Sequence, residues 1–166
     1  MVMRVAGHPL AGRFCSAAGS GGCSVAAQID YKAAFKCVPG AIALLSPDLV
    51  ILDVSDGYVD AAGRSLEDIV GRNILDAFPE NPRDPGDTGP RDLRASLEAV
   101  LATGEPDFMN LVRYDVEDVG HPGDFEERYW AVANMPVCAP GGHITMILHM
   151  AQEVTPFVRT ARVMNS

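Results

Sequence analysis

The feature that most constrains the fold is a pair of apolar-alternating runs separated by a short turn sequence. The runs are Phe125–Met135 and His143–Thr155, and the segment Cys138–Gly142 (CAPGG) lies between them. Alternation of apolar and polar residues is typical of strands, and Pro-Gly-Gly is typical of a tight turn. The pattern therefore predicts a β-hairpin.

The predicted hairpin has two distinct faces. A turn centred on Pro140 and Gly141 pairs Val132 with His149, and side chains alternate between the faces along each strand. One face then carries Trp130, Val132, Asn134, Thr145, Ile147 and His149, and the other carries Ala131, Ala133, Met135, Met146, Leu148 and Met150. Both faces are mostly apolar, so both need cover. The polar side chains on the first face need partners within the fold or in a ligand, because unpaired buried polar groups are costly.

Capping and turn residues divide the rest of the chain into short elements. Residues 1–29 are rich in Gly, Ala and Ser without a sustained period, which predicts a flexible leader. The expected elements are a helix over 31–38 capped by Asp30, strands over 41–45 and 49–54, short helices over 55–62, 65–70 and 73–78, a loop over 79–91, a longer helix over 91–103 and a strand over 107–116. With the hairpin, this order predicts an α+β fold in which helices gather on one side of a five-stranded antiparallel sheet.

Composition excludes several classes of partner. The chain has 166 residues, which favours a single domain, and its net charge of −9 argues against nucleic acid or an anionic membrane as a partner. No apolar run reaches the length of a membrane span. The four cysteines, Cys15, Cys23, Cys37 and Cys138, lack metal-site spacing, so they are expected to be free thiols in a reducing cytoplasm, with no metal bound.

These elements and several local sequences resemble the PAS family of sensory domains over residues 30–155, which leaves 156–166 as a C-terminal tail. The segment VPGAIALLSPDLVILDVSDGYVDAAGRSLEDIVGRNILDAFPENP is similar to the first hairpin and small helices of bacterial PAS domains, and RASLEAVLATGEPD to their long helix. Glu153-Val154-Thr155 is similar to the closing Asp-x-Thr motif, with Glu in place of Asp. RYW, NMPV and ILHMAQEVT resemble a subgroup found in sensor kinases and phosphatases.

The resemblance implies a ligand cavity between the concave face of the sheet and the small helices. Positions that match Ile147, His149 and Ala151 point into the cofactor pocket of flavin- and haem-binding relatives. Strand parity places Trp130 and Asn134 on the same face. The opposite face would be covered by the N-terminal helix or by a second subunit, so a homodimer is expected.

His149 is the sharpest candidate for a functional side chain. It is either a core histidine bonded to a neighbour such as Asn134, a hydrogen-bonding contact for a small ligand, or a metal ligand. Haem is disfavoured because haem-binding relatives carry their iron-bound histidine on the helix that matches 91–103, which has none here. Flavin photochemistry is disfavoured because the light-sensing relatives carry an Asn-Cys-Arg-Phe motif in the segment that matches 61–78, and this segment contains no cysteine here. Tyr58 and Trp130 could stack on a planar ligand or pack in the core.

Two functions remain open. In the first, a small organic ligand of unknown identity is held by His149, Asn134, Trp130, Thr145, Ile147 and Tyr58. The domain would then act as a cytoplasmic sensor that signals to a separate effector through protein contacts. The alternative is an enzyme in which His149 is a general acid or base assisted by Asn134. The chain ends eleven residues after Thr155, so either the effector is another protein or the chain is a fragment.

Overall fold

The computed structural model describes residues 29–164 except 85, 87, 119 and 122, so the expected leader, apart from Ile29, lies outside the described residues. The strands are β1 (Ala41–Leu45), β2 (Ile51–Val54), β3 (Asp107–Arg113), β4 (Val116–Glu117), β5 (Phe125–Glu126), β6 (Tyr129–Cys138) and β7 (Ile144–Glu153). The helices are α1 (Tyr31–Lys36), α2 (Asp56–Ala62), α3 (Leu66–Ile69), α4 (Ile74–Ala77), α5 (Gly89–Thr103) and α6 (Thr155–Met164).

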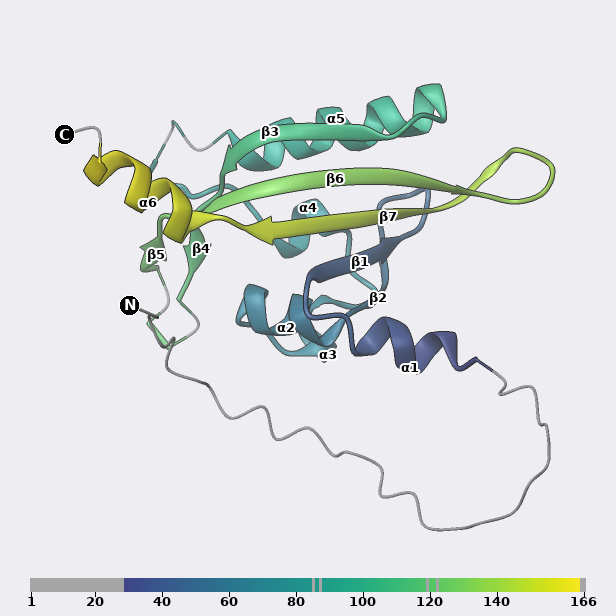
Figure 1. The fold of residues 1–166 in the computed structure, drawn as a ribbon, viewed down its shortest axis with the longest axis horizontal. Helices are drawn as coiled ribbons and strands as arrows, with labels where there is room; N and C mark the ends of the chain where they lie inside the picture. The colour runs from purple at the N-terminus through teal and green to yellow at the C-terminus, as the bar shows by residue number, and fades with distance from the viewer. Residues whose placement is uncertain (1–28, 85, 87, 119, 122, 165–166) are drawn as a thin grey trace, which may run out of the picture.

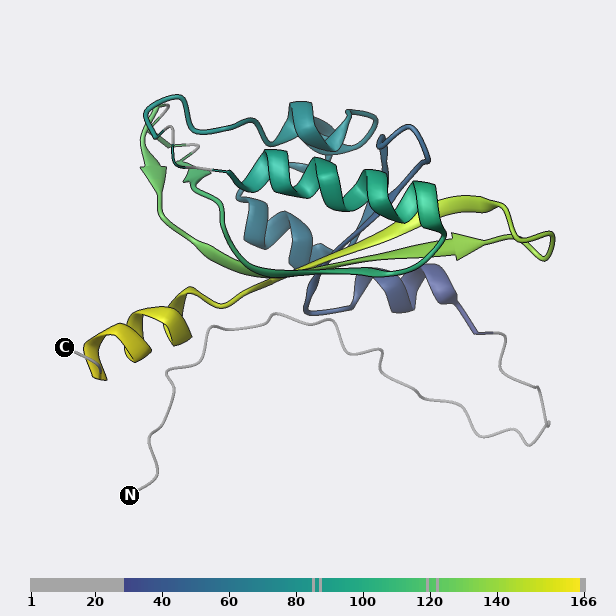
Figure 2. The same cartoon turned by 90° about the horizontal axis from the view of Figure 1, so that it is seen from above.

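The main sheet has five antiparallel strands in the order β2-β1-β7-β6-β3 (Figure 1). Figure 2 shows α2–α5 on one side of this sheet and α1 and α6 on the other. The predicted α+β arrangement is confirmed. Strands β4 and β5 form a separate pair, because β3 leaves the main sheet after Arg113 and β6 enters it only at Tyr129. The strand predicted from Phe125 is therefore broken in two.

Side-chain caps start three of the short helices, and one of them is the expected cap at Asp30. The side chain of Asp30 accepts a hydrogen bond from the backbone of Ala33 at 2.9 Å, that of Ser65 from Asp68 at 3.3 Å, and that of Asn73 from Leu75 at 3.0 Å. Such caps satisfy backbone donors that the first helical turn leaves unpaired. The sequence signals therefore fix where these helices begin.

Ser55 has a different role from the one its sequence context suggests. It precedes α2 but makes no cap bond within that helix. Its hydroxyl donates to the carbonyl of Gly40 at 2.8 Å and accepts from the backbone of Ile42 at 3.0 Å. The fully buried side chain therefore ties the start of α2 to β1, one wall of the cavity described below.

The register of the β6–β7 hairpin differs from the prediction by two residues. His149 pairs with Asn134 rather than with Val132. One residue of the difference comes from Gly142, whose φ of +85° closes a three-residue loop of the type-I-plus-bulge kind. The other comes from an irregularity where Val137 pairs with Met146 and Cys138 with Ile144. A shift of two preserves side-chain alternation, so the predicted faces survive for most residues.

Strand β2 starts later than predicted, at Ile51 rather than at Leu49. Leu49 has a φ of 63°, in the left-handed region, and its backbone donates to the carbonyl of Ser46 at 2.9 Å. This turn conformation is incompatible with an extended strand, so pairing with β1 begins only after it.

The hydrophobic core fills the space between the sheet and α2–α5. Its fully buried large side chains are Leu45, Ile51, Val54, Ile69, Ile74, Leu97, Val100 and Ile147. Leu97 and Val100 belong to an apolar stripe at helical spacing along α5, whose other members Leu93 and Leu101 pack at the edge of the core. The long helix therefore covers the sheet with the face that its spacing predicts.

The C-terminal segment, expected only as a tail, forms α6. The helix follows β7 directly, and the hydroxyl of Thr155 accepts a hydrogen bond from the backbone of Tyr129 at 2.9 Å. Arg162 lies over the Tyr129 ring, 5.0 Å from its centroid. Among the described residues, no helix is long and apolar enough to cross a membrane.

Replacement of Gly57 by Ala should destabilise the domain. A Cβ at this position of α2 would lie 2.6 Å from the carbonyl oxygen of Pro39 and 2.8 Å from that of Gly40, both backbone atoms. We expect the clash to lower the free energy of unfolding by about 2 kcal/mol in urea denaturation. Gly141→Ala is the control, because its nearest contact would be 3.6 Å away. Equal stability of the two variants would contradict this close approach of α2 to the chain before β1.

Candidate functional site

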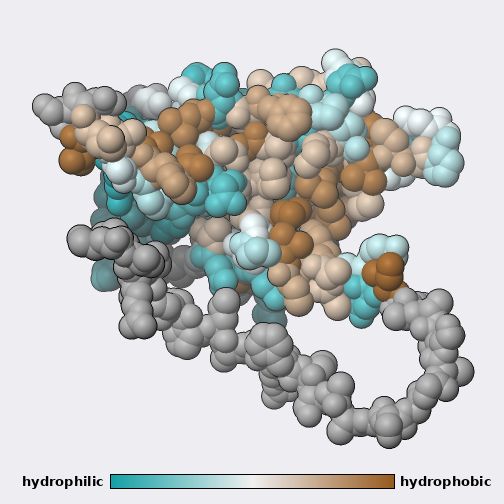
Figure 3. Space-filling model, viewed as in Figure 1, coloured by the Kyte–Doolittle hydropathy of each residue, from teal (hydrophilic) through white to brown (hydrophobic). Residues whose placement is uncertain are grey.

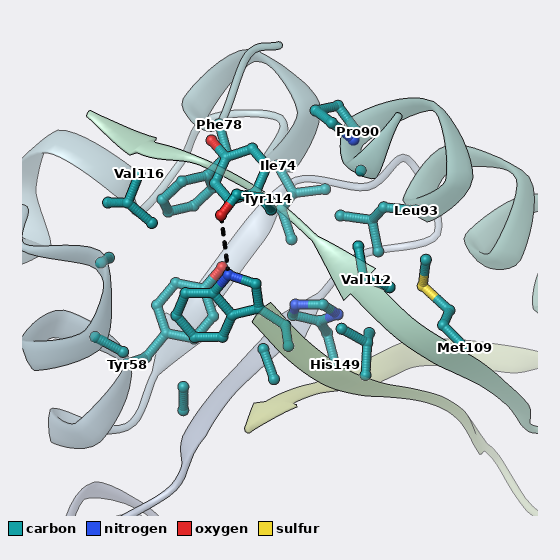
Figure 4. Close-up of a pocket in the computed structure, with 17 residues that line it drawn as sticks. Tyr58, Ile74, Phe78, Pro90, Leu93, Met109, Val112, Tyr114, Val116 and His149 are labelled. Atoms are coloured by element: carbon teal, nitrogen blue, oxygen red, sulfur yellow. Dashed lines mark hydrogen bonds between the residues drawn. The ribbon is translucent and has the colours of Figure 1, made fainter. Parts of the chain in front are cut away.

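A cavity of about 90 Å³ lies between the concave face of the sheet and helices α2, α4 and α5 (Figure 4). Its wall is mostly apolar and aromatic, with Tyr58, Ile74, Phe78, Leu93, Met109, Val112, Tyr114, Trp130, Val132, His149 and Ala151 among its members. Strands β1, β3, β6 and β7 form its floor. Trp130, Val132 and His149, which strand parity groups on one face, therefore all line the cavity.

His149 supplies the main polar group of this wall. The residue is only 4% exposed, and its Nδ1 lies 2.8 Å from Oδ1 of Asn134, its partner across the β6–β7 ladder. Burial lowers the pKa of His149 to about 4, because the apolar surroundings disfavour the charged imidazolium. The bond to Asn134 is the one expected if His149 is a core histidine, and His149 is a neutral imidazole at pH 7.

The bond to Asn134 continues as a hydrogen-bond chain through two further elements, α5 and β3. The Nδ2 of Asn134, which is fully buried, donates to Oγ of Ser96 on α5 at 2.8 Å. The Ser96 hydroxyl in turn donates to the carboxylate of Asp107, at the start of β3. This Asp107–His149 chain links the cavity to the surface between α5 and β3.

Both predicted aromatic residues, Tyr58 and Trp130, lie in the cavity wall. The Tyr58 ring packs edge-on against the His149 ring, with centroids 6.2 Å apart, and against Phe78, with centroids 5.9 Å apart. Trp130 donates from its indole nitrogen to the carbonyl of Tyr114 at 3.2 Å, the bond drawn in Figure 4. Both residues pack in the core and face the cavity at once.

The remaining predicted site residues lie outside the wall. Asn134 stands behind His149, and Ile147 is fully buried in the adjacent core. Thr145 is exposed, and its hydroxyl donates to the carbonyl of Val137 at 2.9 Å. It is the extra residue at the irregularity of the β6–β7 ladder, where a bulge turns a side chain away from its expected face.

Ser96 and Asp107 were not predicted as site residues, although one signal was present. Ser96 lies three residues after Leu93 and one before Leu97, so it interrupts the apolar stripe of α5. A polar residue on a buried stripe needs an internal partner. Neither the identity of that partner nor the involvement of Asp107 can be read from helical spacing.

The described residues contain no group of three or more His, Cys, Asp or Glu side chains arranged to hold a metal ion. Cys37 and Cys138 are exposed free thiols, whereas Cys15 and Cys23 lie outside the described residues. Within the described residues, the cavity wall with His149 is therefore the site that we consider further.

The sequence profile of a family described as PAS fold matches residues 35–159. The chain belongs to the PAS family. The match confirms the predicted resemblance, and this PAS domain is a sensory type of module. No curated protein sequence matches the chain.

Solved PAS domains have the same fold. The chain is similar to a PAS domain from Colwellia psychrerythraea (17% identity, TM-score 0.59, 76% of this chain and 95% of that one). It is also similar to the PAS domain of Bordetella pertussis BvgS (21% identity, TM-score 0.53, 81% and 93%). A third similar structure is the PAS domain of nitrogen regulation protein NR(II) from Vibrio parahaemolyticus (16% identity, TM-score 0.55, 76% and 100%).

The buried imidazole should make stability depend on pH. The pKa of His149 is near 6.5 in the unfolded chain, whereas it is about 4 in the folded state. The unfolded state therefore holds more protons between these values, and the free energy of unfolding falls as the pH drops through this window. The contribution of His149 is fully present above pH 6.5, and about 3 kcal/mol of it is lost by pH 4.

Urea denaturation of the wild type and of His149→Gln across this pH range would measure the effect. The difference between the two curves removes the contribution of carboxylates common to both proteins. His143→Gln, which replaces a histidine exposed at the hairpin turn, is the control and should follow the wild type. Parallel curves for wild type and His149→Gln would contradict the lowered pKa.

Proposed function

We propose that this PAS domain is a sensor that binds a small organic molecule in the cavity and transmits the binding to a protein partner. The observation that carries the proposal is a buried polar imidazole in the wall of an otherwise apolar cavity. A concave apolar site with a few placed polar groups is the usual form of a small-molecule site. The aromatic rings of Tyr58 and Trp130 add flat surfaces on which a planar ligand can pack.

A direct route for transmission runs along β7. His149 and Ala151 face the cavity from this strand, and α6 begins two residues after the strand ends. The junction is held by Thr155 and by an ion pair between Arg128 and Glu153 at 3.6 Å. A ligand that moves β7 would therefore change the position of α6, whose Phe157 and Val163 are about three-quarters exposed and available to an effector protein.

The outer face of the sheet supports a homodimer. This face, opposite the cavity, carries Phe108, Met135, Leu148 and Met150, and Figure 3 shows apolar side chains over it. Phe108 is 71% exposed and Met150 is 37% exposed. Helix α1 leaves them uncovered because Lys36 holds it at β2 through Asp53 and the carbonyl of Val54. Exposed apolar patches of this kind mark interfaces.

The two exposed thiols fit a reducing cytoplasm.

The enzymatic alternative has less support. The described residues of the wall include no carboxylate, lysine, cysteine or serine, so His149 would have no second group of strong acid–base or nucleophilic character. Its pKa of about 4 also makes it a weak base. A sensor needs neither property.

Removal of the imidazole should weaken ligand binding more than it weakens the fold. We expect His149→Ala to lower the occupancy of a co-purified small molecule, seen by native mass spectrometry, with an affinity loss of about tenfold or more for one lost hydrogen bond. His143→Ala, at the exposed turn, should behave as wild type. Unchanged occupancy in His149→Ala would count against the cavity as the ligand site.

A charge on the outer face should abolish self-association. At tens of micromolar protein, sedimentation velocity should show a dimer for the wild type and a monomer for Phe108→Glu, because dimer formation would bury an unpaired carboxylate. Leu66→Glu is a suitable control, since Leu66 is also an exposed apolar residue but lies on α3, on the helical side of the sheet. A monomeric wild type would rule out this interface.

A further inference from the structure

The Asp107–His149 chain has only one consistent set of donors and acceptors. A carboxylate such as that of Asp107 only accepts hydrogen bonds, so the single hydroxyl hydrogen of Ser96 points toward it. The Oγ of Ser96 must then accept from the amide group of Asn134. The other amide hydrogen is directed at Sδ of Met109, 3.8 Å from Nδ2. The amide orientation is therefore set by α5 and β3, and Oδ1 is the atom that faces His149.

This orientation determines which nitrogen of His149 carries the proton. Because Oδ1 of Asn134 can only accept, Nδ1 of His149 must be the donor at 2.8 Å. A neutral imidazole has one proton, so Nε2 keeps a lone pair. No hydrogen bond to Nε2 occurs among the described residues, and the ring lies in the cavity wall (Figure 4). The cavity wall thus presents, at Nε2, a hydrogen-bond acceptor for which the described residues supply no donor.

The rest of the wall limits what can supply that donor. None of the described wall residues carries a formal charge, so an ionic ligand would be buried without a counter-charge. The small volume of the cavity, about 90 Å³, restricts the occupant to a small molecule of no more than about one ring. The rings of Tyr58, Phe78 and Trp130 provide aromatic surfaces for it.

A second polar atom favours a hydroxyl over other donors. Tyr58 makes no hydrogen bond through its hydroxyl within the described part of the chain, although the residue is only 6% exposed. Burial raises the pKa of Tyr58, so the hydroxyl keeps its proton and can donate. A ligand hydroxyl can donate to one protein atom and accept from another, whereas an N–H group of a ring only donates.

We propose that the ligand is a neutral, single-ring phenol whose hydroxyl donates to Nε2 of His149 and accepts from Tyr58. The proposal rests on the proposed sensory function and specifies its ligand class. Ser96 and Asp107 act as positioning residues, because they select the protonation pattern of an imidazole that they do not touch.

Calorimetric titration of the full chain at pH 7.5 with four probes tests the ligand class. Phenol has the required donor, toluene has the same size without it, pyridine only accepts, and benzoate is an anion. We expect phenol to bind about tenfold more tightly than toluene, the effect of one hydrogen bond, and pyridine and benzoate to show no binding. Tighter binding of toluene, pyridine or benzoate than of phenol would overturn the phenol class and leave the sensory function standing.

The role of Ser96 is tested by the protonation of His149 itself. Long-range ¹⁵N–¹H spectra of the free protein should show a protonated Nδ1 and a bare Nε2. In Ser96→Ala the amide of Asn134 can reverse, so a population with protonated Nε2 should appear and the preference for phenol over toluene should shrink. Thr103→Ala, at an exposed hydroxyl on the same helix, should change neither result. A wild-type spectrum with protonated Nε2 would overturn the proposal.

Failure of the two proposals can be told apart. If none of the four probes binds but native mass spectrometry finds another molecule that His149→Ala loses, the phenol class is wrong and the sensory function stands. If no probe binds and no molecule co-purifies, both the ligand class and the sensory function fail.

Discussion

The hydrogen bond between His149 and Asn134 is the interaction on which the arrangement of the cavity depends. It joins β6 to β7 on the concave face of the sheet, and both residues are almost completely buried. The pairing exists only because Gly142 and the irregularity beyond Val137 shift the hairpin by two residues. A shift of one residue would have placed His149 opposite a residue of the outer face. The turn lies far from the cavity, but it determines which residue pairs with the polar group inside it, His149.

Polar residues of this domain are placed at junctions between elements. Ser55 ties α2 to β1, Thr155 ties β6 to α6, and Ser96 ties α5 to both Asn134 and Asp107. Each hydroxyl satisfies backbone or side-chain groups that burial would otherwise leave unpaired. The apolar core supplies the general driving force for burial, and these hydroxyls select one arrangement of sheet and helices. The shape of the cavity depends on this arrangement, because the cavity lies between the sheet and the helices.

Most of the fold could be predicted because its signals are local. Asp30 and Ser65 are capping residues that act within their own turn, and alternation in β6 and β7 identifies which residues share a face. Predictions failed where geometry depended on distant or unusual backbone. The left-handed Leu49 delays β2, and the bulge removes Thr145 from the concave face. Tyr58, Trp130 and His149 were predicted as site residues and lie in the wall, whereas Ser96 and Asp107 were missed.

The sequence by itself determined the order of the elements, the parity of the hairpin and the placement of His149 and Asn134 on one face. It could do so because strand alternation and helix capping depend on residues within a few positions of each other. Only the tertiary structure decided which atoms of that face are paired. The side-chain partners of Asn134 come from β7, α5 and β3, and Asp107 adds the start of β3 to the chain. Packing of separate elements creates these bonds, and local spacing does not encode them.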